Sequence, residues 1–405
     1  MTEDLREALE KSNISHKKIL KHLKIISFTV GAEIRRETKF WNPIKILNIA
    51  LIVNGFICMI GDYNFIHNNL NESIDVYADS LLLSLQVIIS NVKLIYLMFI
   101  QHKFYKVIKM AENSEILLNL KVFELNINGK RKLTQKIKGI LKESWRDIHI
   151  QLSCFIYSCF AIISWYLLVA LAQNIHDLYK HPEDFTLTTT HPVKFPLWLD
   201  RGPKFIIHPL QYINTAVVNY VSGFVAVAYD GVYVVVVVHC AALVRILRLL
   251  VDHSSSYEVP RAKKVQYLLH CIEFYQKIFE FYSYIDGLFR TVNLVQYCIN
   301  ATILCMIMFQ ANMGLEVGVS LVVKMSLYLL AVCCQNVMYC YNGEKLITQS
   351  SLLPNAWYNS CWYSESAEVK FLIRMMILRT NRALYMNISG FSTMSLTTML
   401  ATSLC

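Results

Sequence analysis

Charged side chains are scarce in this sequence of 405 residues: they make up 17% of the chain, whereas hydrophobic side chains make up 55%. Soluble proteins hold ~25% charged and ~45–50% apolar residues. Apolar runs long enough to cross a bilayer are spread along the whole chain. The composition therefore excludes a soluble globular protein and predicts one membrane-embedded unit over residues 1–405.

Motifs for catalysis and metal binding are also lacking. The 12 cysteines form no C-x-x-C pair, and most lie in apolar runs, where a free thiol behaves as a small hydrophobe. No nucleophile elbow, phosphate-binding loop, catalytic carboxylate pair or zinc-ligand spacing is present. We therefore expect no enzyme activity, no metal and no cofactor. The net charge of +10 reports membrane orientation here, so no nucleic-acid partner is expected.

A signal peptide is not visible, because the first 40 residues are polar and basic and lack a short apolar core. Residues 1–45 hold ten Lys and Arg, with apolar positions at helical spacing. This pattern is typical of an amphipathic helix at a membrane surface. We expect the amino terminus to stay in the cytoplasm.

The predicted fold is an all-α membrane protein with seven transmembrane helices. Ten, eleven, seven and five Lys and Arg fall in the segments on one side, and none, four and none on the other. By the positive-inside rule the amino terminus is cytoplasmic and the carboxyl terminus extracellular. A helical cytoplasmic anchor is expected over about 241–290 and 343–382. The expected spans are about 46–62, 76–100, 150–172, 210–240, 291–313, 318–341 and 383–405.

Two kinds of polar position follow from this topology. The sequon that begins at Asn71 lies in a loop expected outside, so Asn71 is a predicted glycosylation site. Lys93, Asp230 and Lys324 lie near or within membrane depth, where a charge is costly. Each lies toward an end of its span, so a structural role and a functional role both stay open.

A ligand pocket is predicted in the outer halves of the second, third, fourth and sixth spans. Aromatic side chains are mixed there with a few hydroxyls and amides, which suits a small apolar molecule. For any one of these residues, ordinary helix packing is the alternative. The candidates are Leu85, Ile88, Ile89, Phe160, Ser164, Trp165, Tyr212, Ala216, Asn219, Tyr220, Met325 and Tyr328.

A second apolar pattern lies outside the lipid, after a break at residues 254–260. Apolar and aromatic residues repeat there at spacings of three and four, which is a heptad-like seam that needs a helical partner in water. A shorter aromatic helix is expected after the sixth span, and it should begin at or after Pro354. The predicted contact residues are Val265, Leu268, Ile272, Tyr275, Phe279, Tyr282, Tyr358 and Trp362.

The junction after the sixth span resembles a known family signature. Gln335, Tyr339-Cys340, Gly343-Glu344, Ser350, Leu353, Ala356, Tyr358 and Trp362 occur in the order found in insect odorant receptors. Further similarity lies at Leu269–Ile272, Gln276–Ile278, Asp230, Trp41–Pro43 and Ser395–Thr397. Tyr275 stands where the family usually has His.

The resemblance implies a subunit of an odorant-gated, non-selective cation channel in the plasma membrane of a sensory dendrite. Its partners would be a small volatile odorant, the lipid bilayer and a shared co-receptor, joined through the anchor as a tetramer. The modest loop between the fourth and fifth spans indicates the ligand-tuning subunit and not the co-receptor. The last span would line the pore, with Ser392, Ser395, Thr398 and Met399.

The last span departs from the family pattern. From Gly390 to Cys405 there are sixteen residues, or ~24 Å of helix, against a hydrocarbon core of ~30 Å. We expect either an incomplete form or a subunit that leaves the gate to its partners. A seven-span receptor that signals through a G protein is the alternative function. A membrane-embedded enzyme or transporter is a third, without a supporting constellation or inverted repeat.

Overall fold

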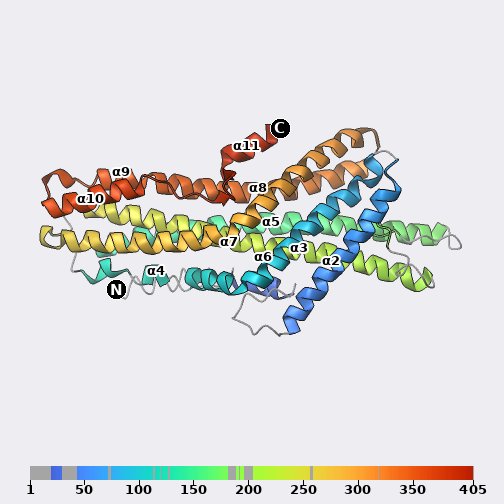
Figure 1. The fold of residues 1–405 in the computed structure, drawn as a ribbon, viewed down its shortest axis with the longest axis horizontal. Helices are drawn as coiled ribbons and strands as arrows, with labels where there is room; N and C mark the ends of the chain where they lie inside the picture. The colour runs from blue at the N-terminus through green and yellow to red at the C-terminus, as the bar shows by residue number, and fades with distance from the viewer. Residues whose placement is uncertain are drawn as a thin grey trace.

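A computed structural model shows a long helical bundle, drawn in Figure 1. The amino-terminal lead-in falls partly outside the described residues, as does the start of the predicted sixth span. The structure describes residues 20–29, 43–71, 74–112, 115–118, 120–125, 128–180, 188–190, 192–195, 204–255, 259–317 and 319–404.

Long helices form the body of the molecule. After a short helix at residues 20–29, six long ones follow. Helices α5, α6 and the first part of α7 run along the long axis, and α2 and α3 cross them obliquely (Figure 1). Short elements lie between or after the long helices: α4 (Glu115–Leu118), η1 (Lys121–Glu124), α9 (Leu353–Tyr358), η2 (Trp362–Ser364) and α10 (Ala367–Thr380). The six long helices are α2 (Pro43–Asn68), α3 (Ile74–Glu112), α5 (Lys130–Lys180), α6 (Lys204–Ser254), α7 (Arg261–Val317) and α8 (Val319–Ser351).

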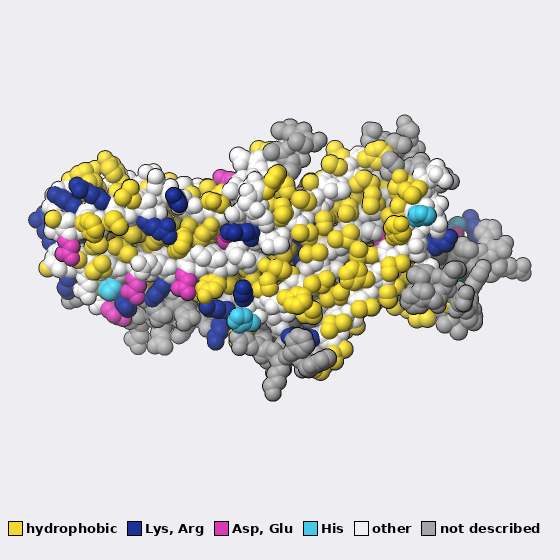
Figure 2. Space-filling view, in the orientation of Figure 1, with side chains coloured by type: hydrophobic (Ala, Val, Ile, Leu, Met, Phe, Trp, Pro, Cys, Tyr) yellow, Lys and Arg dark blue, Asp and Glu magenta, His cyan; other side chains and the backbone are white. Residues whose placement is uncertain are grey.

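In the described part of the chain, six helices are long and apolar enough to cross a membrane. Helix α7 has 57 residues and, at ~1.5 Å per residue, reaches ~85 Å, far beyond a bilayer. One helix therefore contains both a predicted span and part of the predicted anchor. Figure 2 shows the same division: hydrophobic side chains cover one half, and Lys, Arg, Asp and Glu gather toward the end that carries α9 and α10.

Helix α6 is the centre of the bundle. It contacts α2, α3, α5, α7, α8 and α9. In its most apolar stretch of 18 residues, 83% of the residues are buried, against 28% in the corresponding stretch of α2. The apolar stretch from Val232 to Val238 is buried on every face, so it forms the centre of the bundle, whereas α2 lies at the periphery.

The helix ends follow local sequence signals. Helix α2 begins at Pro43, where the missing N–H costs nothing, and Ser366 caps α10 by accepting from the Val369 N–H. The break expected at 254–260 separates α6 from α7. Helix α9 begins at Leu353, one residue earlier than expected, because Pro354 is tolerated in the first turn.

The predicted span 383–405 is not one continuous helix. Residues 387–393 form a hairpin in which β1 (Asn387–Ile388) pairs antiparallel with β2 (Ser392–Thr393). Ser389 and Gly390 have positive φ values of 47° and 83°, which end any helix there. Helix α11 (Leu396–Leu404) has nine residues and reaches ~14 Å. The prediction of a helix from residue 383 was wrong because it overlooked this turn.

Candidate ligand-binding site

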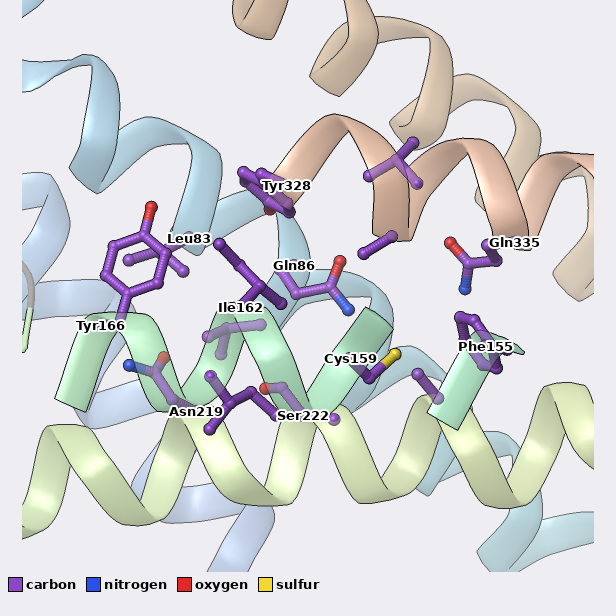
Figure 3. A pocket seen from close by; sticks show the side chains of 16 residues that line it. Leu83, Gln86, Phe155, Cys159, Ile162, Tyr166, Asn219, Ser222, Tyr328 and Gln335 are labelled. Carbon is purple, nitrogen blue, oxygen red and sulfur yellow. The ribbon is translucent and has the colours of Figure 1, made fainter. Parts of the chain in front are cut away.

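A cavity of about 70 Å³ lies inside the bundle between α3, α5, α6 and α8 (Figure 3). Most of its wall is apolar, and amide and hydroxyl groups interrupt it at a few positions. Each of the four helices contributes apolar side chains and at least one polar group, and on α5 the polar groups are the Cys159 thiol and the Tyr166 hydroxyl. The lining residues are Leu83, Gln86, Val87, Phe155, Cys159, Ile162, Ile163, Tyr166, Asn219, Ser222, Gly223, Ala226, Tyr328, Ala331, Val332 and Gln335.

The sequence analysis named the same four helices but mostly other positions on them. Asn219 and Tyr328 line the cavity, whereas Phe160 and Tyr220 are 43% and 38% exposed on the outside of the bundle. Each residue turns a helix by about 100°, so an error of one or two positions moves a side chain off the wall. Ten candidates lie outside the lining: Leu85, Ile88, Ile89, Phe160, Ser164, Trp165, Tyr212, Ala216, Tyr220 and Met325.

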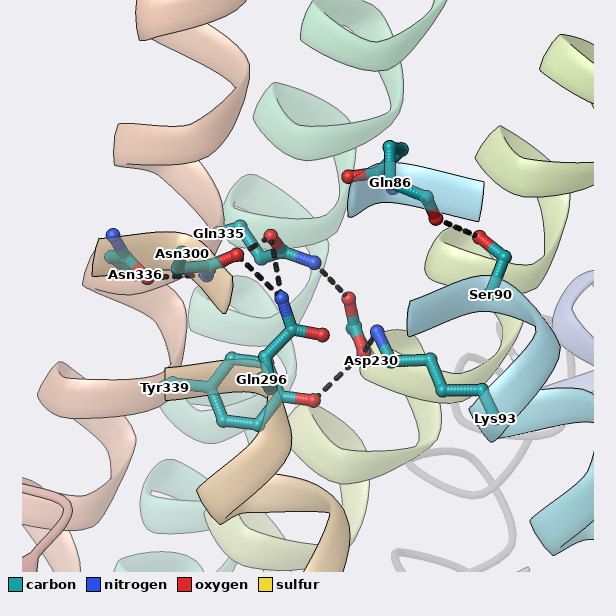
Figure 4. Close-up of polar contacts among 9 residues, drawn as sticks. All are labelled: Gln86, Ser90, Lys93, Asp230, Gln296, Asn300, Gln335, Asn336 and Tyr339. Atoms are coloured by element: carbon teal, nitrogen blue, oxygen red, sulfur yellow. Dashed lines mark hydrogen bonds and ion pairs between the residues drawn. The ribbon is translucent and has the colours of Figure 1, made fainter. Parts of the chain in front are cut away.

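One end of the cavity meets a buried ion pair, shown in Figure 4. Lys93 Nζ lies 2.6 Å from Asp230 Oδ1, and the two side chains are 1% and 0% exposed. Gln335 Nε2 donates to Asp230 Oδ2 at 2.5 Å, and the Tyr339 hydroxyl donates to Oδ1 at 2.7 Å. A carboxylate inside the bundle needs such partners, because an unpaired buried charge is very costly.

Gln335 connects this ion pair to the cavity and to α7. It lines the cavity, and its Oε1 accepts from Gln296 Nε2 at 3.3 Å and from Asn300 Nδ2 at 3.2 Å. Asn300 also donates to Asn336 Oδ1 at 2.6 Å. The sequence analysis flagged Lys93 and Asp230 separately and missed Gln296 and Asn300. Two amides spaced i, i+4 inside a span were the signal that could have found them.

A second set of polar side chains lies at the other end of the cavity. The Tyr328 hydroxyl donates to the Leu82 carbonyl at 3.4 Å, and Lys324 pairs with Asp79. Lys324 Nζ also lies 5.9 Å from the ring centroid of Tyr166, within cation–π range. The side chains of Lys324 and Asp79 are 16% and 21% exposed, so this pair sits at a rim.

An apolar wall with a few amides and hydroxyls can hold a small molecule by dispersion contacts and orient it by hydrogen bonds. In the residues that the structure describes, no three His, Cys, Asp or Glu side chains come together as a metal site. The lining suits a small apolar ligand.

Sequence comparison gives the chain its family. The family model for the 7tm odorant receptors matches residues 73–403. The chain belongs to the odorant receptor family. It is thus a multi-pass membrane receptor and not an enzyme.

Named relatives agree with this assignment. Odorant receptor 63a of Drosophila melanogaster is 28% identical over 400 residues, which cover 98% of this receptor and 94% of the relative. Odorant receptor 67b of the same fly is 26% identical over the same shares of the two chains.

Solved structures share the all-α fold of this odorant receptor. The olfactory receptor OR5 from Machilis hrabei matches with a TM-score of 0.78 and 15% identity, over 96% of each chain. A structure of OR5 in complex with eugenol matches with a TM-score of 0.73 and 14% identity, again over 96% of each chain.

The predicted seam of the odorant receptor packs partly within its own chain. Leu268 and Tyr275 are buried, and Val265, Ile272, Phe279 and Tyr282 are half-buried against the same core. The Tyr282 hydroxyl donates to the Tyr385 carbonyl at 2.8 Å, and burial raises the pKa of Tyr282 to about 12. Part of this seam thus packs against other residues of the same chain.

The shorter aromatic helix lies at the same end of the molecule. Tyr358 is 54% exposed, and Trp362 is half-buried and donates from Nε1 to the Tyr358 carbonyl at 3.1 Å. Their role in contacts between subunits stays a prediction.

The residues expected to line the pore lie around the hairpin. Ser392 is in strand β2, and the Ser395 hydroxyl accepts from the Thr398 N–H at 3.2 Å, which caps α11. Thr398 donates through its own hydroxyl to the Thr393 carbonyl at 2.8 Å, and Met399 packs on the core. Their side chains stabilise this turn, and their place in a pore stays a prediction.

Asn71, the predicted glycosylation site, lies exposed in the turn after α2. This position is accessible, and its modification stays a prediction. The other two residues of the sequon lie outside the described part of the chain.

Proposed function

We propose that this odorant receptor binds a small volatile molecule in the cavity and acts as the ligand-tuning subunit of an odorant-gated cation channel. The observation that carries the proposal is the largely apolar cavity enclosed by α3, α5, α6 and α8. The structure of the Machilis hrabei receptor with eugenol supports a small organic ligand for this fold. The channel would operate in the plasma membrane together with the shared co-receptor.

Helix α8 offers a route from the cavity to the last helix. Tyr328 and Gln335 line the cavity, and two turns beyond Gln335 the same helix meets the carboxyl-terminal segment. Glu344 Oε2 accepts from the Leu396 N–H at 3.3 Å, at the start of α11. Gly343 lies against Met394, where a Cβ would collide with the carbonyl oxygen. A ligand that shifts α8 would therefore move the base of α11.

The anchor end supports assembly with further subunits. On α10, Phe371, Met375 and Leu378 are 62%, 52% and 73% exposed and lie on one face, at spacings of four and three. Apolar side chains gathered outside the lipid mark an interaction surface. From the family resemblance, we expect a partner subunit to pack against this face of α10.

The proposed pocket is tested by recording odour-evoked currents from cells that express the receptor with the co-receptor. Replacing Ala331, which lines the cavity, with Phe should fill the space and reduce responses at least tenfold. The matched control is Leu330→Phe, since Leu330 is the preceding residue on α8 and is 53% exposed. Equal responses from wild type and Ala331→Phe would place the ligand elsewhere.

Orientation separates this proposal from a receptor that signals through a G protein. Basic residues put the amino terminus in the cytoplasm. An epitope tag before residue 1 should therefore be hidden in intact cells and revealed by permeabilisation. A tag that antibodies reach in intact cells would favour the G-protein receptor.

A further inference from the structure

A second hollow lies away from the cavity, between the helix at residues 20–29 and the first half of α5. Its volume is about 530 Å³, several times that of the cavity between the four spans. The amino-terminal helix is held in place by Lys24, whose Nζ lies 2.6 Å from Glu112 of α3. Leu23 packs against Gly231 of α6, next to Leu152. With the helix held there, its residues His22, Leu23 and Ile26 form one wall of the groove.

The opposite wall changes in character along α5. Lys142, Arg146 and His149 line the groove first, and Ser153 and Ile156 follow on the same face, at spacings of four, three, four and three. The stripe from residue 142 to 156 rises ~21 Å. It passes from basic side chains, before the start of the predicted third span, to Ser153 and the apolar Ile156 inside that span. The groove is therefore basic at one end and apolar at the other.

The described residues that line the basic end supply positive charge and no carboxylate to neutralise it. Lys142 and Arg146 are the cations, and the imidazoles of His22 and His149 line the same groove. The nearest acidic residues of α5 are engaged elsewhere: Glu143 with Arg245 at 2.7 Å and Asp147 with Lys345 at 2.6 Å.

We propose that this groove binds an anionic phospholipid of the cytoplasmic leaflet. The phosphate headgroup lies among Lys142, Arg146 and His22, and an acyl chain follows Ser153 and Ile156 into the bilayer. Basic pockets between helices on the cytoplasmic side suit such headgroups, because that leaflet carries the anionic lipids. Bound there, the lipid joins the amino-terminal helix to α5.

The experiment measures lipid binding to the purified full chain in a neutral detergent by native mass spectrometry. Phosphatidylserine should bind more tightly than phosphatidylcholine. Neutralising both cations, with Lys142→Gln and Arg146→Gln together, should weaken phosphatidylserine binding on the order of tenfold or more. The matched control is Lys132→Gln with Lys138→Gln, two exposed residues of the same helix away from the groove. The control should bind like the wild type.

Two further arms separate a lipid from a free anion. Ser153→Trp keeps the charges but blocks the acyl path, and it should weaken phosphatidylserine binding as well. Glycerophosphoserine, the same headgroup without acyl chains, should not compete with the lipid at equal concentration. The proposal is overturned if the two lipids bind equally, if the charge variant binds like its control, or if the soluble headgroup competes fully.

Discussion

The two ion pairs at the ends of the cavity differ in how deeply the protein surrounds them. Lys93 and Asp230 are almost completely buried, and the Asp230 carboxylate accepts two more hydrogen bonds from side chains of α8. Lys324 and Asp79 are partly exposed, with one further donor, Gln310 Nε2, at 3.4 Å from Asp79. The first pair is part of the core where α3, α6 and α8 meet, and the second lies at the rim.

The difference in burial indicates which ion pair contributes more to the stability of the fold. A buried charge depends on every one of its partners, since the surrounding protein offers no water in their place. An ion pair at a rim can exchange a lost partner for water, so it contributes little. Substitutions in the buried pair should therefore reduce the stability of the fold much more than substitutions in the pair at the rim.

The largest effect is expected for Asp230→Leu, which leaves Lys93 buried without its counter-ion. We expect a loss of about 3–5 kcal/mol in stability, seen as a lower melting temperature in detergent and less receptor at the cell surface. The double variant Lys93→Met with Asp230→Leu removes both charges and should recover most of the stability. A single variant as stable as the wild type would show that the pair is not part of the structural core.

A smaller effect is expected for Tyr339→Phe, which removes one hydroxyl donor from Asp230 and keeps the ring. A hydrogen bond to a charged group contributes about 1.5–3 kcal/mol, so the melting temperature should fall by several degrees. Tyr341→Phe is the control, because Tyr341 lies on the same helix and is 41% exposed. Equal melting of the two variants would contradict the role of the Tyr339 hydroxyl.

The smallest effect is expected for Asp79→Asn at the rim. The stability loss should stay under about 1 kcal/mol and shrink further in high salt, because exposed ion pairs are weak and screened. The comparison is made with Asp230→Asn in the same melting assay. If both Asn variants lose the same stability, the distinction between core and rim fails.

Individual residues show how far sequence reasoning reaches. The ends at Pro43 and 254–260 were predictable because prolines and a serine run act locally. The hairpin at 387–393 was missed, although Ser389-Gly390 is a local turn signal, because the apolar residues around it also suit a helix. At the cavity, spans that are apolar on most faces do not reveal which face points inward, so Asn219 and Tyr328 were found and most of their neighbours were not.

By itself, the sequence determined the membrane class, the expected orientation and the family motif that starts at Gln335. Each depends on composition or on residues close together in the chain. Only the tertiary structure decided that Lys93 meets Asp230, 137 positions away, and that Gln335 joins this pair to the cavity. The physical reason is that packing fixes the rotation of each helix and so decides which of its faces points into the bundle. The sequence pattern of one helix does not show which other helices it packs against.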